Sequence, residues 1–236
     1  MGIKDTFKKS WEHSDFKKRI AAINNLNDHD IIINIVKNDE NSNVRALAVK
    51  KINDQAVLEE IAKEDKSKEV RTLAVKKISN QIVLEKIAKE DKSKKVRVQA
   101  VEKINNQEVL VNLFKNTEEE KNIRGLAIKR IKDYTPLKNI AKNEKNSYFG
   151  EIAMMNIDDQ NILADIAKNG ENDFIRAQAV KKINNQAVLE EIAKKDKSDE
   201  VRTEAVKKLN NPSILLNIGK NTKVTHFLPK RSGKIK

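Results

Sequence analysis

The feature that most constrains this chain is a tandem repeat of about 26 residues. The segment VRALAVKKINDQAVLEEIAKED, residues 44–65, returns as VRTLAVKKISNQIVLEKIAKED at residues 70–91. The arginine near the start of each segment recurs every 26 residues, with one spacing of 27 between Arg97 and Arg124. Eight units therefore tile residues 15–221. A repeat of this length is the sequence signature of a solenoid.

Each unit reads as two short helices with recognisable start signals. In the first helix, apolar residues recur at helical spacing, as in Val44, Ala48, Val49 and Ile52. In six units an Asn or Ser stands three residues before the valine position, where it is a good N-cap: Asn41, Ser67, Ser93, Asn146, Asn172 and Ser198. The second helix has an Asp or Asn as its N-cap in every unit: Asp28, Asp54, Asn80, Asn106, Asp133, Asp159, Asn185 and Asn211.

The single inserted residue falls in the loop before Ile123. There the run Thr117–Glu120 has the form of a capping box, which predicts that Thr117 caps the first helix of the fifth unit. The insertion leaves the apolar pattern of the helix intact.

Helices of about ten residues are marginal on their own in water, so each pair must bury its apolar stripe against its neighbours. The sequence therefore predicts an all-α fold, an α-α superhelix or solenoid of about eight two-helix repeats over residues 15–221. We expect residues 1–14 to form an N-terminal capping helix and residues 222–236 a basic, flexible tail. Ile3, Phe7 and Trp11 would cover the open face of the first unit.

The string DKSKEVRTLAVKKI, residues 65–78, resembles the second half of HEAT-type repeats, in which a capping loop precedes Val-Arg-x-x-Ala-Val. HEAT units are usually longer, from about 30 to over 40 residues. The resemblance implies a protein-binding scaffold, although some HEAT-like proteins bind nucleic acid and a few are enzymes, such as DNA glycosylases or bilin lyases. It also implies that the second helices line the concave face, and that the groove is acidic to neutral.

Seven of the nine arginines among the 48 basic residues occupy the repeated arginine column. A planar fork that binds two acceptors is needed there, since lysine is used freely elsewhere. One interpretation is a structural ladder in which each arginine bonds loop carbonyls or the aspartate of an adjacent unit, such as Asp65 or Asp91. The other is a ladder for phosphates, and we favour the structural one. The column consists of Arg19, Arg45, Arg71, Arg97, Arg124, Arg176 and Arg202.

Paired lysines near the end of the first helix form the candidate polyanion-binding ridge. The alternative is a solvated face, because cations at a helix C-terminus complement the dipole. The net charge is +13, but residues 220–236 alone contribute +6, so the repeats are only modestly basic. The candidate ridge consists of Lys50, Lys51, Lys76, Lys77, Lys181, Lys182, Lys207 and Lys208.

The candidate protein-binding residues fall in two groups. On the second helices, acidic pairs and isolated apolar residues would meet a partner in the groove: Glu59, Glu60, Glu190, Glu191, Val111 and Leu216. In the sixth unit, Tyr148 and Met155 bring adaptable apolar side chains where Gly150 replaces the arginine. The alternative is decay of this unit, with Phe149 and Met154 repacking its core.

The sequence carries no catalytic signature. There are no cysteines, the three histidines lie outside any repeated column, and no Walker loop, dinucleotide fingerprint or H-E-x-x-H motif occurs. We therefore expect no catalytic residue, metal or cofactor. No apolar run is long enough to span a membrane. The expected protein is a cytoplasmic, non-enzymatic, monomeric scaffold with a protein partner; the alternative is a nucleic-acid-binding protein acting through the lysine ridge and the basic tail.

Overall fold

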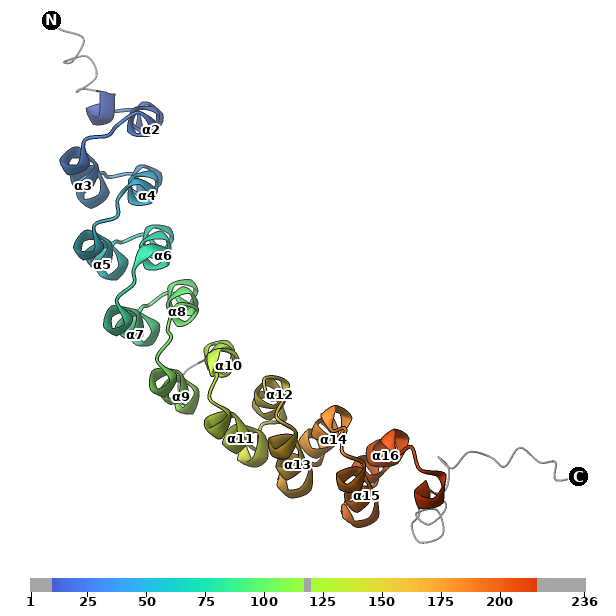
Figure 1. The fold of residues 1–236 in the computed structure, drawn as a ribbon. Helices are drawn as coiled ribbons and strands as arrows, with labels where there is room; N and C mark the ends of the chain where they lie inside the picture. The colour runs from blue at the N-terminus through green and yellow to red at the C-terminus, as the bar shows by residue number, and fades with distance from the viewer. Residues whose placement is uncertain (1–9, 117–119, 216–236) are drawn as a thin grey trace, which may run out of the picture. The chain divides into compact units, whose positions relative to one another are not determined.

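The computed structural model describes residues 10–116 and 120–215, and all regular secondary structure within them is helical. The first helices of the units are called here, as a set, the first row: α2 (Phe16–Asn24), α4 (Ser42–Lys51), α6 (Lys68–Lys77), α8 (Lys94–Val101), α10 (Lys121–Arg130), α12 (Ser147–Met155), α14 (Asp173–Lys182) and α16 (Asp199–Lys208). The second helices form the second row: α3 (His29–Asn38), α5 (Gln55–Glu64), α7 (Gln81–Glu90), α9 (Gln107–Lys115), α11 (Tyr134–Asn143), α13 (Gln160–Asn169) and α15 (Gln186–Lys195). The predicted all-α solenoid is confirmed (Figure 1).

The helix starts are those that the cap residues predict. In each second-row helix from α3 to α15, the side chain of the Asp or Asn N-cap accepts a hydrogen bond from a backbone N–H of the first turn. The predicted caps of the first row also stand at N-cap positions, although Ser93 and Ser198 make no side-chain capping bond.

The predicted capping box at the insertion is wrong. Helix α10 begins at Lys121, and the carbonyl of Glu120 accepts from the amides of Ile123 and Arg124, so Glu120 itself occupies the N-cap position. Thr117 lies outside the described residues. The physical reason is that the extra residue lengthens the loop, which lets the helix begin three residues before its arginine, as α4 and α6 do.

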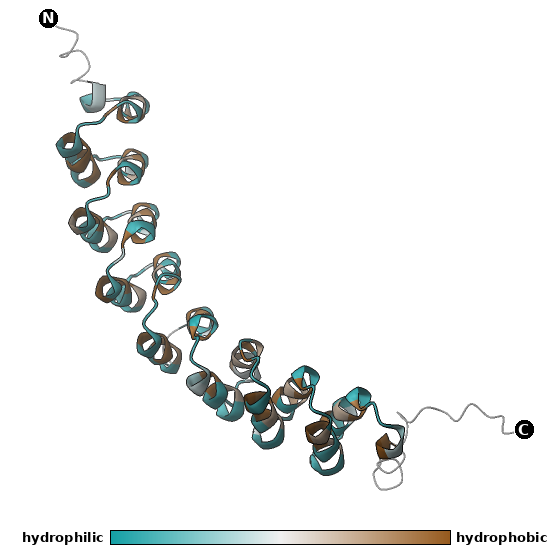
Figure 2. Ribbon diagram, viewed as in Figure 1, coloured by the Kyte–Doolittle hydropathy of each residue, from teal (hydrophilic) through white to brown (hydrophobic). Residues whose placement is uncertain are grey.

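The core lies between the two rows and consists almost entirely of Ile, Leu, Val and Ala. Val44, Ala48, Val49 and Ile52 are fully buried, as their spacing predicts. Figure 2 shows the apolar sides of the two rows turned toward each other. Few aromatic side chains are needed because two short helices at close range leave little space between them.

The repeat unit defined from the sequence joins a first helix to the second helix that follows it. The most closely packed helix pairs are different. Six of the second-row helices pack chiefly against the first-row helix that follows them, as in the antiparallel hairpins α3–α4, α5–α6 and α13–α14. This pairing places the Val-Arg-x-x-Ala-Val motif on the second helix of each packed hairpin.

The chain divides into two compact segments between Leu126 and Ala127, within α10. In the N-terminal segment, α4, α6 and α8 pack against one another more closely than α3, α5 and α7 do. In the C-terminal segment, the same holds for α12, α14 and α16 relative to α11, α13 and α15. Within each segment the row with the closer spacing lies on the inner side of the stack, so the expectation that the second helices line the concave face is wrong. The helices that carry the Val-Arg-x-x-Ala-Val motif belong to this inner row.

Two further expectations fall partly outside the described residues. Trp11 lies in a short 3₁₀ turn, η1 (Ser10–Glu12), that contacts α2, whereas Ile3 and Phe7 are not described. Residues 222–236 are not described either, and a single array over residues 15–221 stays a prediction. Within residues 10–116 and 120–215, no helix combines the length and the apolar character that crossing a membrane requires.

Candidate functional site

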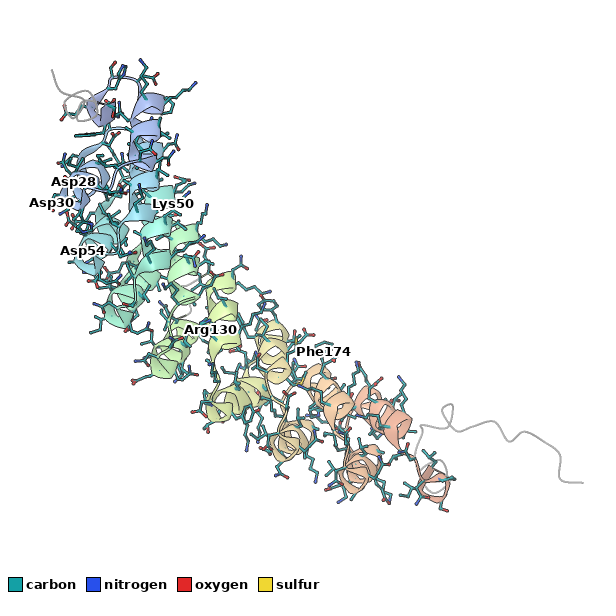
Figure 3. The ribbon with its side chains drawn as sticks, turned by 45° about the horizontal axis from the view of Figure 1, so that its top comes forward. Asp28, Asp30, Lys50, Asp54, Arg130 and Phe174 are labelled. Atoms are coloured by element: carbon teal, nitrogen blue, oxygen red, sulfur yellow. The ribbon has the colours of Figure 1, made fainter. Side chains whose placement is uncertain are left out.

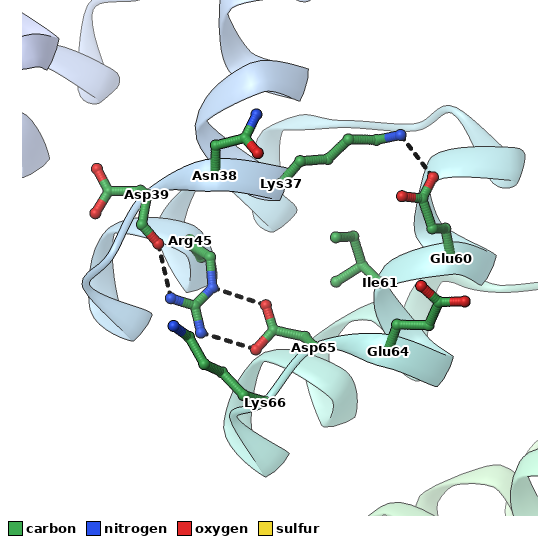
Figure 4. Close-up of a pocket in the computed structure, with 9 residues that line it drawn as sticks. All are labelled: Lys37, Asn38, Asp39, Arg45, Glu60, Ile61, Glu64, Asp65 and Lys66. Carbon is green, nitrogen blue, oxygen red and sulfur yellow. Dashed lines mark hydrogen bonds and ion pairs between the residues drawn. The ribbon is translucent and has the colours of Figure 1, made fainter.

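Arg45 shows the geometry of the arginine column (Figure 4). Its Nε and Nη2 donate to the two carboxylate oxygens of Asp65 at 2.7 and 2.9 Å, and its Nη1 donates to the carbonyl oxygens of Asp39 and Glu40 at 2.8 and 3.1 Å. The arginine and aspartate side chains are only 3% and 4% exposed. The guanidinium thus joins the loop before its own helix to the loop before the next first-row helix.

The same bidentate contact recurs in both segments. It joins Arg19 to Asp39, Arg71 to Asp91 and Arg176 to Asp196. Three other members of the column vary this pattern: Arg97 donates to Glu120, Arg124 to the carbonyl of Phe114, and Arg202 to the carbonyl of Asp196. These are the kinds of partner that the structural interpretation named. The four bidentate arginines are buried and directed at protein acceptors, so they are not presented to phosphates.

The sixth unit lacks both halves of this contact. Gly150 stands where the arginine would be, and Gly170 stands where its aspartate would be. A Cβ atom on Gly150 would lie 3.2 Å from Cδ1 and Cγ1 of Ile175, so Ile175 fills the space of the missing side chain. The loop before α14 is joined instead to the last turn of α11, since the amide of Glu171 donates to the carbonyl of Lys142 at 2.9 Å. Phe149 and Met154 are buried, as repacking of this unit predicts.

The lysine pairs point in two directions. The second lysine of each pair turns into the stack and donates to backbone carbonyls at the C-terminus of the preceding first-row helix, as Lys51 does to Ile23 and Leu26 at 2.7 Å. The inward members are Lys51, Lys77, Lys182 and Lys208. The exposed members are Lys50, Lys76, Lys181 and Lys207, and Lys207 forms a salt bridge with Glu204 at 2.6 Å. Half of the candidate ridge is therefore half-buried and caps helices.

This difference predicts unequal effects within one pair. Lys77→Met should lower the free energy of unfolding by about 1 to 2 kcal/mol, because the carbonyls of Val49, Lys50 and Ile52 lose a charged donor. Lys76→Met changes the exposed neighbour and should stay within about 0.5 kcal/mol of the wild type. Chemical denaturation of the two variants, followed by circular dichroism, measures both values. Equal effects would contradict the inward assignment.

Three of the four acidic candidates of the second row are already paired with lysines, two of them with lysines of the preceding repeat. Glu60 accepts from Lys37 at 2.6 Å and Glu191 from Lys168 at 2.5 Å, while Glu190 pairs with Lys194 one turn along α15. The half-buried Glu59 lies beside Glu60 on α5. The ion pairs of Glu60 and Glu191 link successive second-row helices. The paired glutamates have little free negative charge to attract a basic partner.

Asp165 is the most strongly perturbed carboxylate of this row. Burial by itself would raise the pKa of Asp165, but hydrogen bonds from Lys138, Asn169 and Lys142 outweigh it and bring the pKa to about 2. The neighbours of Asp165 are therefore structural partners from α11 and α13.

Shallow crevices lie where successive second-row helices diverge. The one in Figure 4, between α3 and α5, has a volume of about 300 Å³ and is lined by Ile61 and by the paired groups Lys37, Glu60, Arg45 and Asp65. Similar crevices lie beside Ile87 and Ile192. Their polar walls consist largely of groups bonded to each other, so the crevices follow from the repeat geometry.

An exposed apolar patch is the exception on the first row. Seen along that row, the residue before the core valine position is polar in most units: Lys17, Asn43, Glu69, Lys95, Asn122 and Glu200. The position of the first lysine is polar as well: Asn24, Lys50, Lys76, Glu102, Lys129, Lys181 and Lys207. The exceptions in these two columns are Tyr148, Phe174 and Met155. We call these three residues the apolar face of α12 and α14.

The structure brings these three residues to neighbouring helices. Met155 is 66% exposed, Phe174 is 36% exposed and Tyr148 is half-buried, with its ring edge-on to Phe149 at 5.3 Å. Phe174 stands at the edge of the first row in Figure 3. Tyr148 and Met155 are predicted binding residues, whereas Phe174 is not among the predicted ones. Of the other apolar candidates, Val111 is half-buried on α9 and Leu216 lies outside the described residues.

Residues 10–116 and 120–215 contain no group of three or more His, Asp or Glu side chains arranged to hold a metal ion. Compared with known proteins, the chain matches no protein-family model and has no significant match among curated proteins.

Proposed function

We propose that this protein is a non-enzymatic scaffold that binds another protein through the apolar face of α12 and α14. The observation that carries the proposal is the clustering of Tyr148, Met155 and Phe174 on adjacent helices, in columns that are otherwise polar. A solvent-facing helix surface normally carries polar side chains. Tyr, Phe and Met are enriched at the centres of protein interfaces, and covering such a side chain contributes about 1.5 to 3 kcal/mol.

Other parts of the proposal rest on the sequence. The Val-Arg-x-x-Ala-Val motif supports a HEAT-like affiliation, and the cysteine-free composition is compatible with a cytoplasmic, monomeric protein. Nucleic-acid binding through the lysine pairs is less well supported, because Lys51, Lys77, Lys182 and Lys208 are bonded to backbone carbonyls.

The test compares three forms of the full chain as immobilised baits. The face variant, Tyr148→Ser/Met155→Lys/Phe174→Glu, gives the sixth and seventh units the polar character of the other repeats. The control, Ile82→Lys, removes an apolar side chain that is 80% exposed on the second row. We expect a protein partner to bind the wild type and the control alike and the face variant at least about 10-fold more weakly.

Circular dichroism and thermal melting verify that both variants fold. Equal binding of the partner to all three baits would contradict the proposal. So would tight nucleic-acid binding that falls steeply with salt and persists after residues 220–236 are removed.

A further inference from the structure

We infer that the partner segment at the apolar face is a short amphipathic helix that runs antiparallel to α12, with acidic residues in its first turn and basic residues in its last. This inference rests on the proposed function and specifies the chemistry of the partner. Three features of the C-terminal segment carry it: the spacing of the apolar side chains, the charge at the two ends of the face, and the direction of the helix dipoles.

The apolar side chains have the dimensions of one helix face. Tyr148 and Met155 are seven residues apart, which places them on the same side of α12 and about 10 Å apart along its axis. Between them Ile152, 7% exposed, lines the same stripe. Phe174 occupies on the neighbouring α14 the repeat position that Tyr148 occupies on α12. The axes of packed helices are about 8 to 10 Å apart. A helix of two or three turns with apolar residues at i, i+3 or i+4, and i+7 presents a matching set of side chains.

The charges at the two ends of this face differ in sign. At the N-terminal ends of α14 and α16, Asp173 and Glu200 are exposed. At the C-terminal end of α14, Lys181 is exposed, with its Nζ 3.5 Å from the amide oxygen of Gln178. In the N-terminal segment the corresponding helix starts are mixed in charge, with Lys68 and Lys95 as well as Glu69, and no exposed aromatic side chain stands between them. A complementary segment has its acidic end over Lys181 and its basic end near Asp173 and Glu200.

The helix dipole then fixes the direction of the partner. Acidic residues stabilise the first turn of a helix and basic residues the last turn, because the N-terminus carries partial positive charge. A partner helix whose acidic first turn lies over Lys181 runs antiparallel to α12 and α14. In that direction the dipole of the partner helix is antiparallel to the dipoles of α12 and α14, which is the favourable arrangement.

The experiment uses a displayed library of random 16-residue peptides selected on the full-length protein. Binders that also bind the face variant are discarded. We expect the enriched peptides to carry apolar residues at i, i+3 or i+4, and i+7, with acids before them and bases after them. Synthetic copies should lose about 3- to 10-fold in affinity on Lys181→Glu, measured by fluorescence anisotropy. Lys76→Glu, the same column position in the N-terminal segment, is the matched control and should leave the affinity unchanged.

Charge-reversed copies of the same peptides complete the design, because they should prefer the Lys181→Glu protein over the wild type. No enrichment over the face variant would overturn the inference, as would affinities that respond neither to Lys181→Glu nor to peptide charge reversal. If the bait comparison identifies a face-dependent partner while the library does not, the helical occupant is wrong and the proposed function stands. If neither experiment gives face-dependent binding, the proposed function fails as well.

Discussion

Arg71→Ala is expected to lower the free energy of unfolding by about 3 to 5 kcal/mol, because it leaves Asp91 buried without its partner. Arg71 donates to the two oxygens of Asp91 at 2.7 and 2.9 Å and to the carbonyl of Asp65 at 2.7 Å. The two side chains are 2% and 5% exposed, so water does not replace the lost contacts. The Asp91 carboxylate raises the already high pKa of Arg71, which keeps the guanidinium charged over the working pH range.

Arg71→Lys should cost nearly as much. A lysine ammonium is a point charge on a flexible stem, and it cannot occupy two carboxylate oxygens and a carbonyl at once. Urea denaturation followed by circular dichroism measures both variants. Repeat arrays need not unfold in a single step. Amide hydrogen exchange at α4, α6 and α8 therefore shows which of these helices lose stability.

A double-mutant cycle with Asp91→Ala separates the pair from its surroundings. The double variant should be less destabilised than the sum of the two single variants, since neither charge is then left alone. High salt should change the result little, because a buried pair is weakly screened. A cost below about 1 kcal/mol for Arg71→Ala would contradict a structural ladder and reopen the phosphate interpretation.

Most of the fold could be predicted because its determinants are local. Repeat length, helix starts and buried stripes are each contained in a window of about 26 residues. The pairing of helices is not local: a periodic sequence can be divided at any point, and nothing within one unit says whether a second helix packs more closely on the helix before it or on the one after it. For that reason the concave row was assigned wrongly.

The inward lysines were missed for a related reason. Lys50 and Lys51 are adjacent and equally basic, but they point about 100° apart on a helix. Comparing the same position across all repeats distinguishes the two lysines. The outward position varies in charge, with Glu102 and Met155 among the lysines, whereas the inward position holds Lys, Arg or Asn throughout. Phe174 also stands out only in such a comparison.

A column of glutamines went unnoticed in the same way. Gln55 accepts from the amide of Ser79 at 3.0 Å and donates to the carbonyl of Lys77 at 3.3 Å, which joins its helix to the next unit. Gln160 and Gln186 make the same two bonds in the C-terminal segment. Where these columns are occupied, a repeat is thus tied to the next by arginine, lysine and glutamine contacts in addition to its apolar core.

Gly150→Arg, which restores the repeated arginine, is expected to destabilise the C-terminal segment by about 3 kcal/mol or more. The new side chain would meet Ile175, since even a Cβ atom at this position lies 3.2 Å from its terminal carbons. Its guanidinium would also be buried opposite Gly170, which offers no carboxylate. Gly150→Ala, the control, adds the Cβ atom without the charge and should cost about 1 kcal/mol.

Gly170→Asp alone should also destabilise, because a Cβ atom there would lie 2.8 Å from the carbonyl oxygen of Ile166. The combination Gly150→Arg/Gly170→Asp/Ile175→Val supplies both charged partners and the smaller core residue found in most other units, so it should recover part of the loss, while the close contact of position 170 with the carbonyl of Ile166 remains. Chemical denaturation of this series shows whether the three positions are coupled. Without coupling, Gly150→Arg alone is neutral or stabilising, whereas coupling predicts that stability returns only when all three positions change together. Coupling of the three positions would mean that the contact between Gly150 and Ile175 holds α12 in place. This is the helix that carries Tyr148 and Met155.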